Sequence, residues 1–321
     1  MNNKHNGWRV PAILAAVLAV APLTMPVNIA NEIVVMAIFA MAANLIIGVA
    51  GLYSFGHATF FGVGAYMGGY VLAQFQTSTL TTLLIATVVG ALSATIIGAI
   101  VIRRAGFYFM MLTFAFNQMA FYVVLTWSSV TGGEDGMGGI TRTPLGIPGL
   151  GSLNLDDRQV FYALCALVFL ASYYILNRVK RSALGLVLES AKENPRRTAS
   201  IGYSVYRAQI TAFAISGAFA GLAGALYALL YRFVPVDTIS LAMSGNVLFM
   251  IVIGGLSSMV GPLIGAAVFV WLQGLFSLMW ARWALLFGLF IVLVVFTMPN
   301  GLVGAFEKLR AFWAQRKGGR P

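Results

Sequence analysis

The sequence predicts an all-α protein, a polytopic transmembrane bundle of about ten helices. Of the 321 residues, 60% are hydrophobic and 9% are charged, whereas about a quarter of the residues in a water-soluble domain are charged. Residues 33 to 102 contain no Asp, Glu, Lys or Arg, which is room for about three spans of ~20 residues. Because backbone polar groups cannot stay unpaired in hydrocarbon, these runs must be helical.

Charge-free runs predict seven spans before residue 232. Lys4 and Arg9 precede the first run in the manner of a secretory signal, but Pro22 follows the only small-x-small triplet, which favours an uncleaved first span. Pro22 and Pro26 end this span, and the Ser-Thr cluster at 77 to 82 separates the third from the fourth. The spans are near 10 to 26, 30 to 50, 57 to 75, 79 to 102, 106 to 127, 159 to 177 and 208 to 231.

The positions of Lys and Arg orient these spans. If the chain starts inside at Lys4, the loop at 128 to 158 is outside and the loop at 178 to 207 is inside. The first loop holds two Arg against four carboxylates, and the second holds seven Lys or Arg against two Glu, as the positive-inside bias requires. The basic tail at 300 to 321 also belongs inside. We therefore expect one transmembrane domain over 1 to 321 with both termini on the inner side.

An odd number of crossings must then connect Arg232 to the tail. Residues 245 to 299 have room for three short spans, broken near 254 to 262 and at 280 to 283, where two tryptophans flank Arg282 as at a membrane interface. One crossing at 245 to 272 is an alternative that leaves the tail outside. A re-entrant or broken segment near 245 to 265 is another way to replace a pair of spans.

Glycines recur four residues apart in three of the predicted spans. This spacing places both members of a pair on one helix face, where a neighbouring backbone can approach closely. Plain helix packing is the favoured interpretation, and a sliding or hinging surface is the alternative. The pairs are Gly64 and Gly68, Gly217 and Gly221, and Gly261 and Gly265.

No arrangement of catalytic residues is evident. Neither His5 nor His57 has an acid nearby in sequence, and no lysine follows a glycine as a Walker A loop requires. The nine carboxylates fall in loops or at span ends, which argues against a proton-driven carrier. Cys165 is the single cysteine, which excludes a disulfide. We expect no enzymatic activity, no metal ion and, because the +11 net charge gathers at span ends, no nucleic-acid partner.

The loop at 178 to 207 has the local signals of a short helix. Asn194 can cap a helix at 196 to 201, Pro195 suits its first turn, and Gly202 can close it. Such a helix could dock into a partner protein. A solvated basic loop near anionic membrane lipid is the alternative.

Several segments resemble the permeases of branched-chain amino acid ABC transporters, of the LivM type. The loop motif resembles that family's R-E-N-x-x-R-A-x-x-x-G, although Lys192 stands where the family often has Arg. The matching blocks follow one another over nearly the whole chain. They are GLYSFGHATFFGVGAY at 51–66, TGGEDG at 131–136, ENPRRTASIG at 193–202, SGAFAGLAGALY at 216–227, GG at 254–255 with GPLIGA at 261–266, and PNGL at 299–302.

The resemblance implies one subunit of an ATP-driven importer in the bacterial inner membrane. Its partners would be a second related permease in a heterodimer, two cytoplasmic ABC ATPases that bind ATP and Mg²⁺, and a periplasmic binding protein, so this chain needs no cofactor of its own. The 128 to 158 loop would be periplasmic, and the 178 to 207 loop would couple to the ATPases. The implied coupling residues are Glu189, Glu193, Asn194, Arg196, Arg197 and Gly202.

The family implies branched-chain, hydrophobic amino acids as substrates, and it also includes importers of urea, amides and aromatic acids. An autonomous facilitator or channel for a small polar solute is the alternative from another class. Polar residues within the spans are candidates for the pathway, although hydrogen bonding between helices is the favoured interpretation of each of them. These residues are Asn44, Ser54, His57, Asn117, Gln118 and Asn246.

Overall fold

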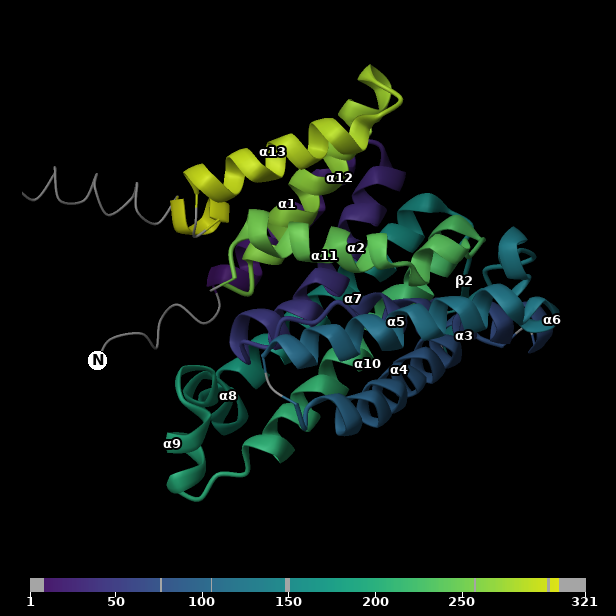
Figure 1. Ribbon diagram of the computed structural model, residues 1–321. Coiled ribbons are helices and arrows are strands. Elements are labelled where there is room, and N and C mark those ends of the chain that lie inside the picture. The colour runs from purple at the N-terminus through teal and green to yellow at the C-terminus, as the bar shows by residue number, and fades with distance from the viewer. Residues whose placement is uncertain are drawn as a thin grey trace, which may run out of the picture.

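The computed structural model describes residues 9–75, 77–104, 106–147, 151–256, 258–298 and 301–305. They form a helical bundle (Figure 1), which confirms the predicted polytopic fold. Apart from 301–305, the tail predicted at 300 to 321 lies outside the described residues. The helices are α1 (Arg9–Thr24), α2 (Val27–Asn44), α3 (His57–Phe75), α4 (Thr79–Val101), α5 (Phe107–Thr126), α6 (Ser128–Thr131), α7 (Arg158–Lys180), α8 (Ala183–Glu193), α9 (Pro195–Ser200), α10 (Val205–Tyr231), α11 (Leu241–Gly254), α12 (Gly261–Met279) and α13 (Trp283–Thr297).

Each of the ten predicted spans is helical, with bounds that agree within a few residues. On length and composition, seven helices of the described chain can cross a membrane, and the apolar helices α1 and α11 are shorter. The seven are α2 with its π-helical extension η1 (Leu45–Val49), α4, α5, α7, α10, α12 and α13. Breaks after Gly254 and at 280–282 divide the C-terminal region into three helices, so the alternative of one crossing at 245 to 272 is wrong.

Local capping explains where several helices begin. The side chains of Ser78, Asp157, Ser204 and Ser240 each accept a hydrogen bond from a backbone N–H in the first turn that follows. These N–H groups have no partner within the helix, so the caps stabilise each helix start. At the other end of α11, Gly255 has φ 108°, a conformation that favours glycine and ends the helix.

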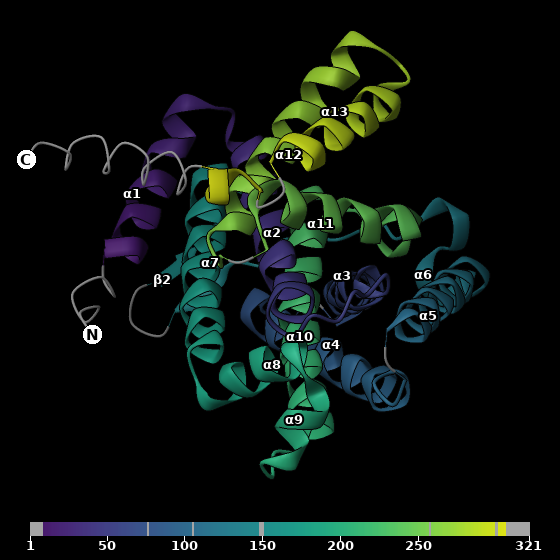
Figure 2. The ribbon, with the colours of Figure 1, turned by 60° about the vertical axis from the view of Figure 1, so that its left-hand side comes forward.

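Helices α2 and α10 form the centre of the bundle. In Figure 2, α1 and α7 lie on one side of them, α4 and α5 on another, and α12 and α13 on a third. In the most apolar 18-residue stretch of each helix, 94% of the residues are buried for α2 with η1, but only 22% for α5. Most of α5 therefore lies at the surface of the described bundle.

The predicted glycine pairs lie where helices cross at close range. A Cβ on Gly64 of α3 would overlap the backbone of Gly221 in α10, and a Cβ on Gly68 would lie 3.0 Å from that of Ala225. On another side of α10, a Cβ on Gly217 would be 2.6 Å from the carbonyl oxygen of Gly90 in α4. Gly261 and Gly265 pack in the same way on the backbone of α11, at Gly255 and Met250. Only glycine permits these separations.

The loop at 128 to 158 contains structure that the sequence did not reveal. Strands β1 (Leu145–Ile147) and β2 (Gly151–Leu153) pair antiparallel, with Leu145 opposite Leu153. Two short 3₁₀ helices, η2 (Gly133–Asp135) and η3 (Val236–Ile239), flank an antiparallel bridge between Met137 and Val234. The bridge joins the loop after α6 to the segment after α10.

Candidate functional site

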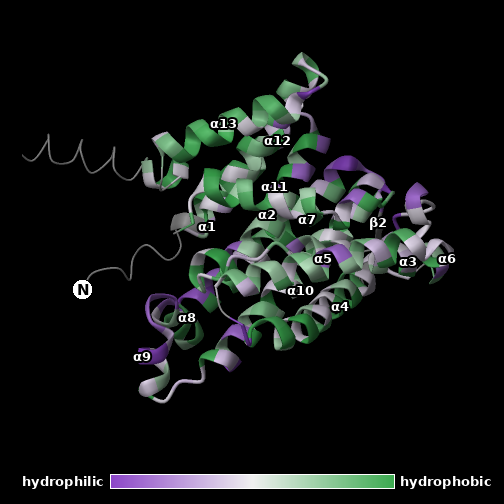
Figure 3. Ribbon diagram, viewed as in Figure 1, coloured by the Kyte–Doolittle hydropathy of each residue, from purple (hydrophilic) through white to green (hydrophobic). Residues whose placement is uncertain are grey.

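Helices α8 and α9 project from the bundle as a polar unit (Figures 1 and 3). The Asn194 side chain accepts a hydrogen bond of 3.0 Å from the Arg197 N–H, and Pro195 occupies the first turn of α9. Gly202 has φ +93° just after the helix. The short helix is therefore built by the local signals read from the sequence, whereas the 11-residue helix α8 before it was not predicted.

The predicted coupling residues lie on the outside of this unit. Glu189, Glu193, Asn194, Arg196 and Arg197 are all exposed. Large apolar side chains are exposed on the same surface of α8 and α9, which lies past the end of the long apolar helices. Leu186 is 62% exposed, Ile201 67% and Tyr203 53%. Exposed apolar groups among charged ones are typical of a protein-binding surface.

Lys192 connects α8 to the end of α2. Its ammonium donates a hydrogen bond of 2.8 Å to the carbonyl of Gly48 in η1. Its stem crosses Gly51, where a Cβ would lie 2.5 Å from the Lys192 Cγ. Gly51 has φ +71° and begins the turn that leads to α3. Sequence reasoning noted Lys192 only as a departure from the loop motif, because nothing local links it to residue 48.

His57 holds three helices together. Its Nε2 lies 3.1 Å from the Ser216 Oγ of α10, and that hydroxyl donates to the Ala42 carbonyl of α2 at 2.6 Å. Because the single hydroxyl proton is used on Ala42, we assign the His57 Nε2 as the donor to Ser216. The side chain is fully buried. Ser54, three residues earlier, accepts from the Gly56 N–H at 3.2 Å and shapes the turn before α3.

Asn117 of α5 is the centre of a second buried cluster. Its amide donates to the Thr59 Oγ1 of α3 at 3.1 Å and to the Ile239 carbonyl of η3 at 2.8 Å. Its carbonyl accepts from the Ser244 hydroxyl of α11 at 3.5 Å, and the same hydroxyl accepts from the Ala58 N–H. Four separate elements are thus joined at one amide.

The other three amides named from the sequence lie apart from these clusters. Asn44 is buried and donates to the Ser258 carbonyl, 3.2 Å away in the link between α11 and α12. Gln118 of α5 and Asn246 of α11 are partly exposed, and neither side chain forms a hydrogen bond with another described residue. A pocket of about 270 Å³ opens between these two helices, lined by Phe55, Met110, Met111, Phe114 and Leu241.

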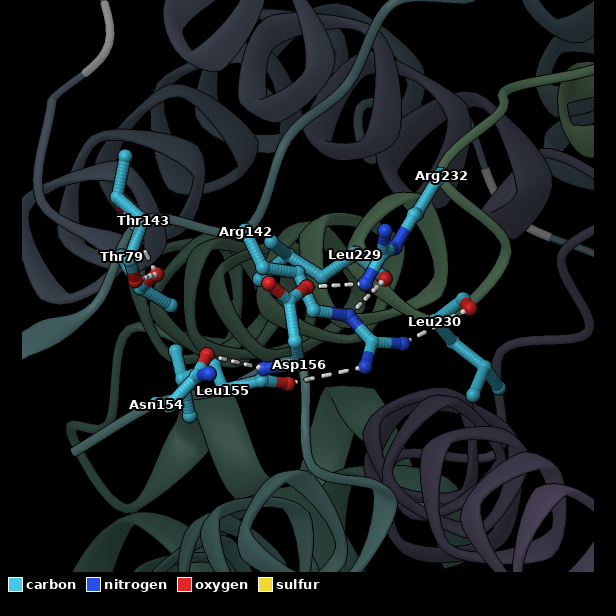
Figure 4. A network of polar contacts seen from close by, with 9 residues as sticks. All are labelled: Thr79, Arg142, Thr143, Asn154, Leu155, Asp156, Leu229, Leu230 and Arg232. Atoms are coloured by element: carbon cyan, nitrogen blue, oxygen red, sulfur yellow. Dashed lines mark hydrogen bonds and ion pairs between the residues drawn. The ribbon is translucent and has the colours of Figure 1, made fainter.

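Arg142 ties the opposite end of the bundle together (Figure 4). Its guanidinium donates to the carbonyls of Leu229 at 2.9 Å, Leu230 at 3.1 Å and Leu155 at 3.0 Å. It also stacks 4.0 Å above the ring of Phe161 in α7. Burial, and then the charge of Arg232, lower the pKa of Arg142, which as an arginine stays protonated.

Arg232 itself pairs with Asp156 beside this network. The ion pair is exposed on both sides, so it adds little to stability. Within the described residues, no group of three or more His, Cys, Asp or Glu could hold a metal ion. The contacts of Arg142 thus join the loop at 128 to 158 to α7 and α10.

Comparison with known proteins agrees with the order of motifs along the chain. The family model for the permease component of the branched-chain amino acid transport system matches residues 25–297, from the end of α1 to the end of α13. The high-affinity branched-chain amino acid transport system permease proteins LivM of Salmonella typhimurium and Escherichia coli are each 29% identical to this chain over 295 residues. The alignments cover 86% of this chain and 69% of each relative.

No solved structure matches the chain. The family model nevertheless spans every helix from α2 to α13, including the α8–α9 unit. The chain therefore belongs to the family of branched-chain amino acid transport permease components.

Proposed function

We propose that this permease subunit of an ABC importer carries branched-chain amino acids, and that α8 and α9 receive the force that drives it. Family membership supports an importer subunit in the inner membrane. In this proposal the chain pairs with a second, related permease, two cytoplasmic ATPases and a periplasmic binding protein. The observation that carries the assignment is the α8–α9 unit, which combines a charged surface with exposed Leu186, Ile201 and Tyr203.

The arrangement of the chain ends supports a cytoplasmic position for this unit. Pro11 and Ala12 at the start of α1 share a pocket with Arg181 and Ser182 before α8. At the other end of the described chain, Gly301 lies against Gly254 and Gly255. The linker after Gly255 reaches Gly48, which Lys192 contacts. With the charge bias, we place this end of the bundle, both termini and α8–α9 in the cytoplasm.

The Lys192 contact is our proposed route from the ATPases into the bundle. A displacement of α8 moves the Gly48 carbonyl directly, because 2.8 Å separates it from the Lys192 ammonium. Gly48 lies in a π-helical turn, a feature often found at functional sites. The chain then passes through Gly51 to His57 and the start of α3. Small shifts at the turn would therefore reorient α3 against α10.

We place the translocation pathway on the face shared by α5 and α11. An amide without a hydrogen-bond partner is costly in hydrocarbon, so Gln118 and Asn246 are better placed beside water or another subunit than beside lipid. Phe114 and Met111 lie one and two turns before Gln118 and line a pocket on α5. An apolar wall with a few amides suits an amino acid with an aliphatic side chain. The buried Asn44, His57 and Asn117 would then be structural links rather than ligands.

Uptake by the assembled transporter tests this function. We expect proteoliposomes with both permeases, the ATPases and internal ATP to accumulate labelled leucine, isoleucine or valine when the binding protein is added. Accumulation by the lone chain without the ATPases would contradict an ATP-driven importer. Faster uptake of urea, an amide or an aromatic acid by the same vesicles would contradict the proposed substrate class and leave the coupling role intact.

Charge reversal tests the docking surface separately. In the variant that combines Arg196→Glu and Arg197→Glu, we expect substrate-stimulated ATP hydrolysis to be lost while membrane insertion persists. Arg158→Glu is the matched control, because Arg158 is also exposed but begins α7 at the opposite end of that helix. Equal stimulation in both variants would show that α9 does not dock to the ATPases.

A further inference from the structure

A pocket of about 970 Å³, whose mainly apolar lining carries two arginines, lies between the start of α1 and the end of α7. Arg178, Arg181, Asn177 and Ser182 line its α7 side, and Pro11 belongs to its α1 side. The pocket is at the end of the bundle that carries α8, since α8 begins directly after Ser182. None of the coupling or pathway residues described above is part of it.

The charge of this pocket is wholly positive. No carboxylate lines it, and neither Arg178 nor Arg181 forms an ion pair with any described residue. Both guanidinium groups are exposed, and a spacing of three residues places them on neighbouring positions of the helix end. Asn177 and Tyr174 add hydrogen-bond donors, whereas the Ser182 hydroxyl already donates to the Val179 carbonyl at 2.7 Å. This donor set suits an anion with several oxygen atoms, such as a phosphate group.

An apolar groove begins at Ile13, the residue after Ala12 of the pocket, and continues along α1. It has a volume of about 440 Å³ and is lined by side chains that include Ile13, Val17 and Val20. These three side chains are 61%, 54% and 51% exposed. They recur at helical spacing and form an exposed stripe along the surface of α1, beyond the residues that line the pocket.

We infer that this pocket binds the phosphate of an anionic phospholipid in the cytoplasmic leaflet, with an acyl chain along the groove of α1. The two arginine forks would hold the phosphate oxygens, and Asn177 and Tyr174 would bind the rest of the headgroup. A basic pocket between membrane helices on the cytoplasmic side is a recognised type of lipid headgroup site. A zwitterionic headgroup would bring its own cation beside the arginines and bind less well.

The lipid would act as a clamp between α1 and α7. The two helices already meet through buried Leu14 and Leu18, and the Tyr162 hydroxyl donates to the Leu18 carbonyl at 2.7 Å. The headgroup would add a contact at the end where α7 turns into α8. The inference rests on the proposed cytoplasmic orientation of this end and is independent of the substrate.

Lipid binding to the complete, detergent-purified transporter tests the site. Delipidated complex is mixed with dioleoylphosphatidylglycerol, dioleoylphosphatidylcholine or inorganic phosphate, and bound lipid and apparent Tm are measured. We expect dioleoylphosphatidylglycerol to remain bound and to raise Tm. The combined Arg178→Gln and Arg181→Gln variant should lose at least tenfold in affinity for this lipid. Arg196→Gln with Arg197→Gln removes the same charge from α9 and should bind like the parent.

Ala12→Trp provides a second variant that fills the pocket and keeps both arginines, and it should lose the same lipid. Equal binding by the arginine variant and the α9 control would overturn the inference, as would equal binding of the two lipids. A Tm shift reproduced by phosphate alone would point to free phosphate and also overturn it. If the site binds as expected but leucine is not imported, the proposed substrate is wrong and the lipid site stands.

Discussion

Gly221 offers a direct test of the close helix packing around α10. In the Gly221→Ala variant, the new Cβ would lie 2.6 Å from the Ala86 carbonyl oxygen and 3.0 Å from the Gly90 Cα, both in α4. Non-bonded heavy atoms pack best at about 3.5 Å, so α10 and α4 would have to separate by about 1 Å. Overpacking of this kind costs ~1–3 kcal/mol, which corresponds to a fall of roughly 2–6 °C in Tm. The close approach of Gly221 to Gly64 means that the contact with α3 would be disturbed as well.

Thiol reactivity is a suitable assay, because the single cysteine, Cys165, is fully buried in α7. A maleimide dye should react with it only as the bundle unfolds, so the midpoint of labelling against temperature reports Tm. Gly245→Ala is the matched control, since nothing lies within 4 Å of a Cβ at that position. This control should keep or raise Tm, because Ala favours a helix over Gly by up to about 1 kcal/mol. The same Tm for both variants would refute the argument from helix separation.

Two further predictions concern the opposite ends of the bundle. Arg142→Met should destabilise the protein by about 2–4 kcal/mol, since three carbonyls lose a charged donor. An unchanged midpoint of Cys165 labelling would show that water replaces the guanidinium without cost. Lys192→Met keeps the stem over Gly51 and removes the donor to Gly48, so uptake per ATP hydrolysed should fall roughly fivefold if the contact is worth about 1 kcal/mol. Ser190→Ala on the exposed side of α8 should leave that ratio unchanged, and an unchanged ratio in Lys192→Met would remove the contact from the coupling route.

Local features of the sequence were sufficient to find α9 but not α8. Asn194, Pro195 and Gly202 act within one turn of the helix they delimit, so their effect can be read without the rest of the chain. Helix α8 has no side-chain cap at Ser182, and it packs against η1, α7 and α10. Its start is not marked locally, although Leu184, Leu188 and Ala191 recur at the spacing of an amphipathic helix and were a signal that could have revealed it.

The polar residues within the spans show the same difference between what the local sequence reveals and what tertiary packing decides. Their positions within apolar runs predicted that each needs a partner, but the partners are far away in sequence. Asn44 meets Ser258 and His57 meets Ser216, at separations of 214 and 159 residues. Which amides remain partly exposed, as Gln118 and Asn246 do, depends on how the helices are rotated against one another.

The sequence by itself determined the membrane class, the ten helical segments, the C-terminal breaks and the family. The physical reason is that a bilayer demands long apolar helices and leaves charges at their ends, so composition along the chain is enough. Only the tertiary structure decided the connection from Lys192 to Gly48, the clamp at Arg142 and the basic pocket beside α1. Each of these depends on which helix faces come together, and packing determines that choice after the helices have formed.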